Sequence, residues 1–212
     1  MAHSGIEVLF QGKNFLRLMG DLWTSVWIAG VSLGFGLFLG TFLGILRTLK
    51  NAVLRIVLRL YLEFFRIVPT IVLLFLVYYI LPRQFHVEVS AEWMAVLAFS
   101  LWVSAEFSDI VRGALESVPK HQREAGLALG LTKGQLFVHV LMPQAFMLEL
   151  PAAINLATRV INVGQQIIEA NNQQYPSGVF WIYGFIFMLY FIVDYPLSLI
   201  SKMLQQKFSA NL

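Results

Sequence analysis

Five long apolar stretches, separated by short polar ones, alternate along the chain. They cover residues 22–46, 53–81, 91–115, 145–161 and 179–204. An α-helix rises about 1.5 Å per residue, so about 17–25 apolar residues cross a hydrocarbon core of about 30 Å. We therefore expect an all-α membrane protein with five transmembrane helices, the second of which ends at Pro82. No apolar run is left over for a sixth span.

A polar segment between the third and fourth apolar stretches predicts two short helices. The first is expected over about 118–129 and is ended by Gly130, which suits a helix C-terminus. Thr132 and Gln135 have the Thr-x-x-Gln spacing of a capping box. They predict a second helix, which is expected to stop before Pro143 because Pro cannot continue a regular helix.

The first of these short helices carries an unusually shallow surface. Ala125, Gly126 and Ala128 have small side chains or none, and Glu124 adds one negative charge. Such a surface can fit into a groove on another protein. The same pattern also suits a loop that only covers the end of the helix bundle.

Composition agrees with a membrane protein and limits the available chemistry. Hydrophobic residues make up 58% of the chain and charged residues 13%, against about 25% charged in soluble domains. The absence of cysteine excludes disulfides, thiolate catalysis and cysteine-based metal sites. Five spans leave no room for a sizeable soluble domain, so a catalytic or ligand-capturing unit is expected on a partner.

The domain organisation predicted from this pattern is one membrane domain at 20–208. Residues 1–19 are expected to form an extracytoplasmic segment, and 209–212 a short tail. Within the first segment, EVLFQG resembles a 3C protease site of expression tags, which suggests an engineered piece. Native sequence is the equal alternative, because Lys13 stands where that site usually has Pro.

Basic residues are unevenly distributed between the two sides of the predicted spans. Lys13, Arg17 and Arg83 fall on one side. The other side carries Arg47, Lys50, Arg55, Arg59, Arg112, Lys120, Arg123, Lys133, Lys202 and Lys207. Because cytoplasmic loops carry the excess of Lys and Arg, we expect the N-terminus outside and the C-terminus in the cytoplasm. The polar segment is then the longest cytoplasmic connection.

Glycines recur every four residues in the first span, at Gly36, Gly40 and Gly44. This spacing leaves one helix face nearly free of side chains, so a neighbouring helix can approach closely. We expect the stripe to pack within the molecule, and a seam between two copies is the alternative.

The polar segment also matches a known motif. Glu124, Ala125 and Gly126 are followed after three residues by Gly130, and after nine more by VLMP at 140–143. This resembles the EAA motif of bacterial ABC importer permeases, which reads Glu-Ala-Ala, three residues, Gly, nine residues, Ile, one residue, Leu-Pro. The spacing matches throughout, and the three substitutions are small. The resemblance implies a MetI-like, type I importer permease with a coupling loop at about 117–143.

Three further stretches resemble the polar amino acid branch of that family. They are YLEFFRIVPTIVLLFLVYYILP, EFSDIVRGALESVPKHQREAGLALG and YPLSLI. One departure is large, because the Lys-Asp-Thr-Ser-Leu-like segment usual after the fourth span has no counterpart beyond Asn162. Either the chain has a true deletion near 161–163 or a segment has been omitted there from the sequence, and we expect an omission.

The resemblance implies a bacterial inner-membrane importer subunit with defined partners. These are a pair of P-loop ATPase subunits, a second permease that is identical or related, and an extracytoplasmic substrate-binding protein. Glu124, Ala125, Gly126, Gly130 and Pro143 would couple the permease to the ATPase. The chain has no G-x-x-x-x-G-K-[ST] loop, so ATP and Mg²⁺ are expected on the partner, and the chain itself is expected to be a transporter subunit and not an enzyme.

Several charged side chains fall inside predicted spans, where they are costly and usually face the bundle interior. Glu63 and Arg66 are about one turn apart, which predicts an ion pair within one helix. Glu106, Asp109 and Arg112 repeat along one face of the third span. They suit either pairing with the second span or a place along the translocation path.

The fourth span carries two further candidates for the path. Arg159 could hold the carboxylate of an amino acid, and Asn155 could be a polar contact or an interhelical hydrogen bond. Asp194 in the fifth span is expected to be structural. Metal ligands are not expected.

Other functional classes fit less well. An intramembrane hydrolase needs a buried nucleophile and base or metal ligands, yet the histidines, His3, His86, His121 and His139, all lie outside the predicted spans. A secondary carrier usually shows internal repeats and interrupted helices, which five unequal spans do not clearly show. A membrane scaffold outside the ABC class remains the other alternative, and it would not bind an ATPase.

Overall fold

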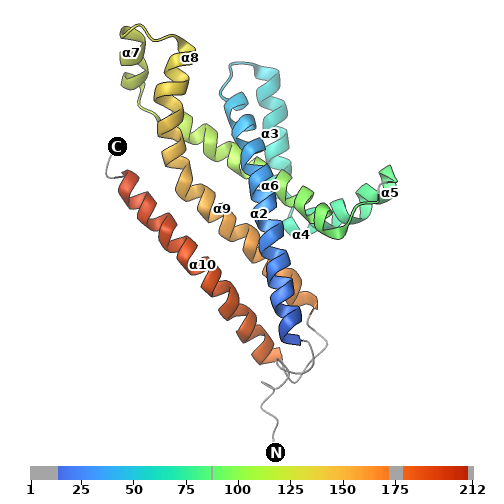
Figure 1. The fold of residues 1–212 in the computed structure, drawn as a ribbon. Helices are drawn as coiled ribbons and strands as arrows, with labels where there is room; N and C mark the ends of the chain where they lie inside the picture. Colours follow the sequence, from blue (N-terminus) through green and yellow to red (C-terminus); the bar gives the residue numbers. More distant parts are fainter. Residues whose placement is uncertain (1–13, 87, 172–178, 210–212) are drawn as a thin grey trace, which may run out of the picture.

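The computed structural model describes the backbone of residues 14–86, 88–171 and 179–209, and the side chains of 15–86, 88–161 and 184–207. Every element in these ranges is helical. Figure 1 shows them as a bundle of long, tilted helices, with the short helices α7 and α8 at one end and α4 and α5 at one side. In chain order they are α2 (Asn14–Arg47), α3 (Ala52–Ile67), α4 (Thr70–Phe75), the π-helical turn η1 (Leu76–Ile80), α5 (Leu81–Phe85), α6 (Ala91–Ser117), α7 (Lys120–Ala128), α8 (Lys133–Leu136), the π-helical turn η2 (Phe137–Leu141), α9 (Met142–Asn171) and α10 (Val179–Ser209).

The prediction of an all-α membrane protein is confirmed, and the number of spans needs qualification. Within the described residues, four helices are long and apolar enough to cross a membrane: Phe15–Arg47, Ala91–Ser117, Lys133–Ile161 and Gly184–Lys207. A fifth crossing requires α3 and the segment Thr70–Phe85 to be counted as one span.

The second apolar stretch, expected to form the second span, is not one straight helix. Its two halves, Ala52–Ile67 and Thr70–Phe85, are bent by 104°. Val68 is extended (φ −73°, ψ 120°) because the ring of Pro69 disfavours a helical conformation in the residue before it. Pro82 does not end the segment either, since it lies in the first turn of α5, where a missing N–H is tolerated.

Helix α6 lies at the centre of the bundle. In its most apolar window 67% of the residues are buried, against 28%, 22% and 17% in the other three spanning helices. The main core surrounds α6 and joins it to α2, α9 and α10 through Phe99, Val103, Phe107, Val111 and Leu156, among others. The outer helices therefore leave apolar surface for lipid or for another subunit.

The glycine stripe of α2 packs against α6. A Cβ atom built on Gly40 would lie 2.9 Å from the Phe107 Cβ atom, and one built on Gly44 would lie 2.6 Å from the Val111 Cβ atom. Real Cβ atoms do not approach so closely, so the two helices meet at a distance that only glycine allows. Gly36 lies in the same way against Val103. The stripe is thus occupied within the molecule.

Helix α9 continues through the point at which a missing segment is expected. Its backbone is helical to Asn171. The side chains beyond Ile161 lie outside the described residues, so the expected omission near 161–163 stays a prediction. The same holds for the proposed tag in residues 1–13.

Candidate coupling hairpin and polar network

Helices α7 and α8, with the turn between them, form a hairpin over residues 120–136 at one end of the bundle (Figure 1). The turn depends on Gly130, whose φ of +85° lies in the left-handed region that favours glycine. The Leu131 N–H donates to the Gly126 carbonyl at 3.1 Å, and the Gly130 N–H to the Leu127 carbonyl at 3.0 Å. These bonds satisfy carbonyl groups at the end of α7 that have no partner within the helix. Gly130 ends the first short helix as predicted.

The capping box at the start of α8 is present as the sequence predicts. The Thr132 hydroxyl accepts from the Gln135 backbone N–H at 3.3 Å, and the Gln135 side-chain oxygen accepts from the Thr132 N–H at 3.0 Å. The two bonds satisfy donors that a helix start leaves free, and they fix the direction in which α8 leaves the turn.

The second short helix does not stop before Pro143, which corrects the prediction. Instead α8 passes through the π-helical turn η2 directly into α9. The Met142 N–H donates to the Phe137 carbonyl, five residues back. This wider turn admits Pro143, which has no N–H to give to a regular ladder. The hairpin and the long helix α9 are therefore continuous.

Three contacts hold α7 against its neighbours. A Cβ atom on Gly126 would lie 2.6 Å from a Leu136 methyl carbon, so α7 and α8 are in close contact there. The Arg123 guanidinium donates to the Leu115 carbonyl near the end of α6. The Gln144 side chain of α9 donates to that of Gln122 at 2.5 Å. The hairpin is thus attached to α6 and to α9.

The outer face of the hairpin is exposed. Glu124, Ala125 and Gly130 are exposed, and Leu129 is 84% exposed. A leucine so exposed at the tip of a hairpin is costly in water unless another surface covers it. The candidate coupling residues therefore divide into two groups. Gly126 lies buried inside the hairpin, whereas Glu124, Ala125 and Gly130 lie on its surface. Pro143 is exposed at the start of α9, outside the hairpin.

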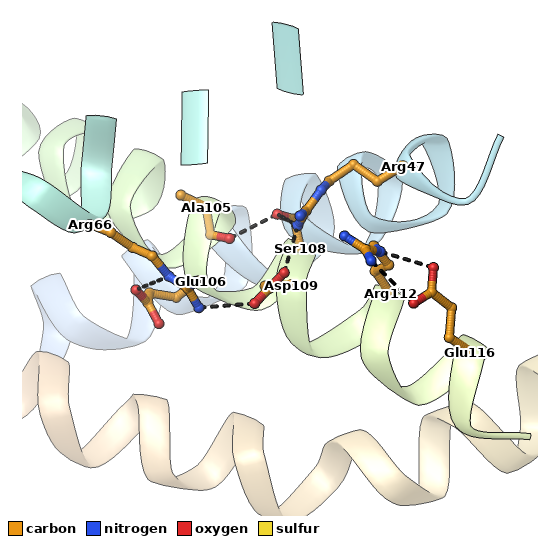
Figure 2. A network of polar contacts seen from close by, with 8 residues as sticks. All are labelled: Arg47, Arg66, Ala105, Glu106, Ser108, Asp109, Arg112 and Glu116. Carbon is orange, nitrogen blue, oxygen red and sulfur yellow. Dashed lines mark hydrogen bonds and ion pairs between the residues drawn. The ribbon is translucent and has the colours of Figure 1, made fainter. Parts of the chain in front are cut away.

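A second polar site ties three helices together below the hairpin. Figure 2 shows Asp109 of α6 between two arginines, and its two oxygens lie 3.0 Å from Arg47 of α2 and 3.0 Å from Arg66 of α3. Glu106 pairs with Arg66 at 3.3 Å. Arg47 also donates to the Ser108 hydroxyl at 3.4 Å. The Arg47 side chain is 5% exposed, so these partners are needed to stabilise its buried charge.

This network corrects the expected ion pair between Glu63 and Arg66. Arg66 turns to α6 because two carboxylates there lie on one helix face and offer it a forked site. Glu63 is exposed on α3 and has no ion pair within the described residues. Arg112, the third charged residue of the α6 face, pairs with Glu116 at 2.9 Å along its own helix. The structure thus brings Glu106 and Asp109 together with the second apolar stretch.

Arg159 and Asn155 are not part of this network. Both are exposed on α9, about one turn apart, and Arg159 makes no ion pair within the described residues. Sequence reasoning missed the role of Arg47, which it counted only as a cytoplasmic charge. A signal was present, since Arg47 follows the glycine stripe by three residues and so continues its face toward α6.

Comparisons with known proteins agree with this architecture. Residues 32–209 match the family described as binding-protein-dependent transport system inner membrane component. The L-cystine transport system permease protein TcyB of Bacillus subtilis is 31% identical over 66% of this chain, and the match covers 64% of its own length, just under two thirds. The arginine transport system permease protein ArtQ of the same organism is 29% identical over 69% of this chain and 72% of its own.

Solved structures share the fold. A chain of an amino acid ABC transporter crystallised with histidines superposes with a TM-score of 0.80 at 21% identity, covering 98% of this chain and 100% of its own. A chain of the inward-facing MetNI methionine ABC transporter gives a TM-score of 0.76 at 18% identity over 93% and 99%. Since the family match takes in α6, the hairpin and α9 together, the chain belongs to the binding-protein-dependent inner membrane components, the non-catalytic permease subunits of ABC transporters.

Proposed function

We propose that this permease subunit forms part of the path by which an ATP-driven importer moves polar amino acids across the bacterial inner membrane. The substrate class is supported by the relatives, whose names include cystine and arginine transport systems. The branch-specific stretches of α3–α5 and of α6–α7 point the same way. The N-terminus is assigned to the outside and the C-terminus to the cytoplasm, following the distribution of Lys and Arg.

The α7–α8 hairpin is the part that couples the permease to its motor. The observation that carries this role is the combination of the EAA spacing with an exposed helix that is fastened to α6 and α9. The exposed face of the hairpin, with Glu124, Ala125 and the turn at Gly130, docks into a cleft on a P-loop ATPase subunit. Displacement of α7 then reaches the membrane through α9, because η2 joins the hairpin and α9 without a break.

The remaining partners follow from this role. A second permease, identical or related, completes the path, and an extracytoplasmic binding protein delivers the amino acid. ATP and Mg²⁺ are held by the ATPase pair, and this chain contributes no group to hydrolysis. Nucleic acid is not among the proposed partners.

Two of the four candidate residues for the translocation path are given another role. Glu106 and Asp109 are engaged by arginines of two helices, so we assign them to holding α2 and α3 on α6. Arg159 and Asn155 remain as candidates for a substrate contact, because both are exposed on a spanning helix and lie on one face of it. A cation at this position suits the carboxylate that every amino acid carries.

A charge reversal on the hairpin tests the coupling role. In the assembled transporter in proteoliposomes, Glu124→Arg should lower amino acid uptake and substrate-stimulated ATP hydrolysis by about tenfold or more, as expected for a mispaired charge at a docked surface. Glu92→Arg makes the same charge change on an exposed residue at the start of α6 and should leave both rates within about twofold, as for an isolated surface charge.

Normal uptake and hydrolysis with Glu124→Arg would contradict the docking role. Uptake that continues without any ATPase subunit would instead favour a secondary carrier. A chain that neither transports nor retains an ATPase subunit on purification would favour a scaffold.

A further inference from the structure

An apolar cavity of about 770 Å³ lies between α2, α6 and α9. None of its lining residues belongs to the hairpin at 120–136 or to the Asp109 network, although Pro143 at the start of α9 is among them. The rings of Phe38, Phe42 and Phe146 flank it and are themselves largely exposed, so the cavity is open to the surroundings of the bundle. The rest of the lining is apolar apart from Thr41 of α2 and Glu149 of α9.

Glu149 is the one ionisable residue in this lining. It is 6% exposed. Within the described residues, no hydrogen bond or ion pair joins its carboxyl group to any other group, whereas Glu106 and Asp109 are both paired. An ionised carboxylate in such surroundings is strongly unfavourable without a partner, and buried acids are therefore paired or protonated. The packing of this helix does not supply the partner.

The composition of the lining restricts what the partner is. The lining contains one acidic residue, four phenylalanines and no Lys, Arg or His. A zwitterionic amino acid or a phospholipid headgroup brings a negative charge that nothing here neutralises. A neutral acyl chain fits only if the Glu149 carboxyl group is protonated, and it leaves that group without a hydrogen-bond partner. A positive charge on an apolar body satisfies both the carboxylate and the rings, which attract cations through their faces.

We propose that the cavity is a binding site for a hydrophobic organic cation, an amine or quaternary ammonium compound with an apolar body, whose charged group lies against Glu149. The site is independent of the coupling role of the hairpin. It does not require the chain to be an amino acid importer, so either proposal can fail without the other.

Photo-crosslinking of the full chain in phosphatidylcholine nanodiscs tests this site. The probe is a dodecyltrimethylammonium ion with a diazirine on its alkyl chain, and the control probe is the same chain ending in a hydroxyl group. The cationic probe should label peptides of α2 and α9 that line the cavity, and Glu149→Gln should lower that labelling by about tenfold, which is the loss of one charge-assisted contact. Labelling by the neutral probe should stay unchanged, which also reports that the cavity is intact.

Glu92→Gln, which removes an exposed carboxylate of α6 outside the lining, should leave both labels unchanged. A competition experiment on the unaltered chain does not depend on any variant folding. Excess unlabelled dodecyltrimethylammonium should remove the label, and excess dodecanol should not. Equal labelling by the two probes, no effect of Glu149→Gln on the cationic label, or equal competition by the alcohol would each overturn the proposal.

Discussion

At the scale of single residues, the most constrained group is the carboxylate of Asp109. Each of its oxygens serves a different arginine, one from α2 and one from α3. Arg47 is almost wholly buried, whereas the Arg66 side chain is 40% exposed. The two ion pairs therefore contribute unequally to stability. A buried charge that loses its partner cannot be solvated by water instead, whereas an exposed charge can.

This difference predicts unequal effects of two conservative changes. Asp109→Asn leaves Arg47 buried with only the Ser108 hydroxyl, so we expect a loss of about 1–3 kcal/mol in the free energy of unfolding. Glu106→Gln removes only the more exposed pair with Arg66 and should cost less than about 1 kcal/mol. Unfolding of the purified chain by sodium dodecyl sulfate, followed by circular dichroism, measures both. Equal losses would show that the burial of Arg47 does not set the strength of the network.

At the scale of elements, the contact between α2 and α6 depends on missing side chains. The stripe of Gly36, Gly40 and Gly44 meets Val103, Phe107 and Val111. Gly34 lies on the same helix but off this face, with no atom within 4 Å of a Cβ built on it. One helix thus provides both a test and its control.

Gly44→Ala should destabilise the chain by about 1–3 kcal/mol, because the new methyl group would overlap Val111 and the Ser108 carbonyl, which is backbone and cannot move aside. Gly34→Ala should be neutral or stabilising by up to about 1 kcal/mol, since alanine favours the helix. The same detergent unfolding measures both variants. A loss with Gly34→Ala as large as with Gly44→Ala would mean that helix flexibility, and not close packing, explains the stripe.

Local signals in the sequence predicted the short elements well and the long ones less well. The capping box of Thr132 and the turn at Gly130 depend on neighbouring residues only, and both are present. The three prolines at 69, 82 and 143 do not act alike. The chain bends at Pro69, whereas the helix continues through Pro82 and Pro143. A π-helical turn absorbs the missing N–H in the last case, and periodicity alone does not signal such a turn.

The polar contacts show the same limit. The positions of Glu106 and Asp109 on one face were readable from their spacing, but their partners were not. The arginine of α3 could have paired within its own helix or with another, and tertiary packing decided the outcome. Arg47 entered the site because the glycine stripe brings α2 so close to α6. Pairings between distant segments depend on the approach of whole helices, which spacing along one helix does not specify.

At the scale of the whole molecule, α6 is the hub and the hairpin is attached to its end. Arg123 binds the last turn of α6, and Gln122 binds α9. A change in the turn should therefore affect coupling while leaving the α2–α6 packing intact. Substitutions at Gly130 and Gly134 distinguish an effect on coupling from an effect on the stability of the bundle.

Gly130→Ala places a side chain at φ +85° and should cost about 1–2 kcal/mol locally. In the assembled transporter we expect substrate-stimulated ATP hydrolysis to fall by about threefold or more, with an unchanged midpoint of bundle unfolding, because strain of this size shifts a local equilibrium by about tenfold. Gly134→Ala, at a helical and open position of α8, should change neither. If Gly130→Ala lowers the unfolding midpoint as much as Gly44→Ala does, the hairpin is part of the folding core and not a separable attachment.

The three glycine contacts between α2 and α6 also bear on how this chain diverges. Each glycine and the residue opposite it share one fixed space, so a larger residue in α2 is tolerated only if the α6 position shrinks in compensation. Among relatives, the volumes at positions 36 and 103, 40 and 107, and 44 and 111 should therefore vary inversely and in pairs. Amino-acid replacement at these six positions should then be slow, because a replacement on one helix destabilises the contact until a compensating replacement occurs on the other helix.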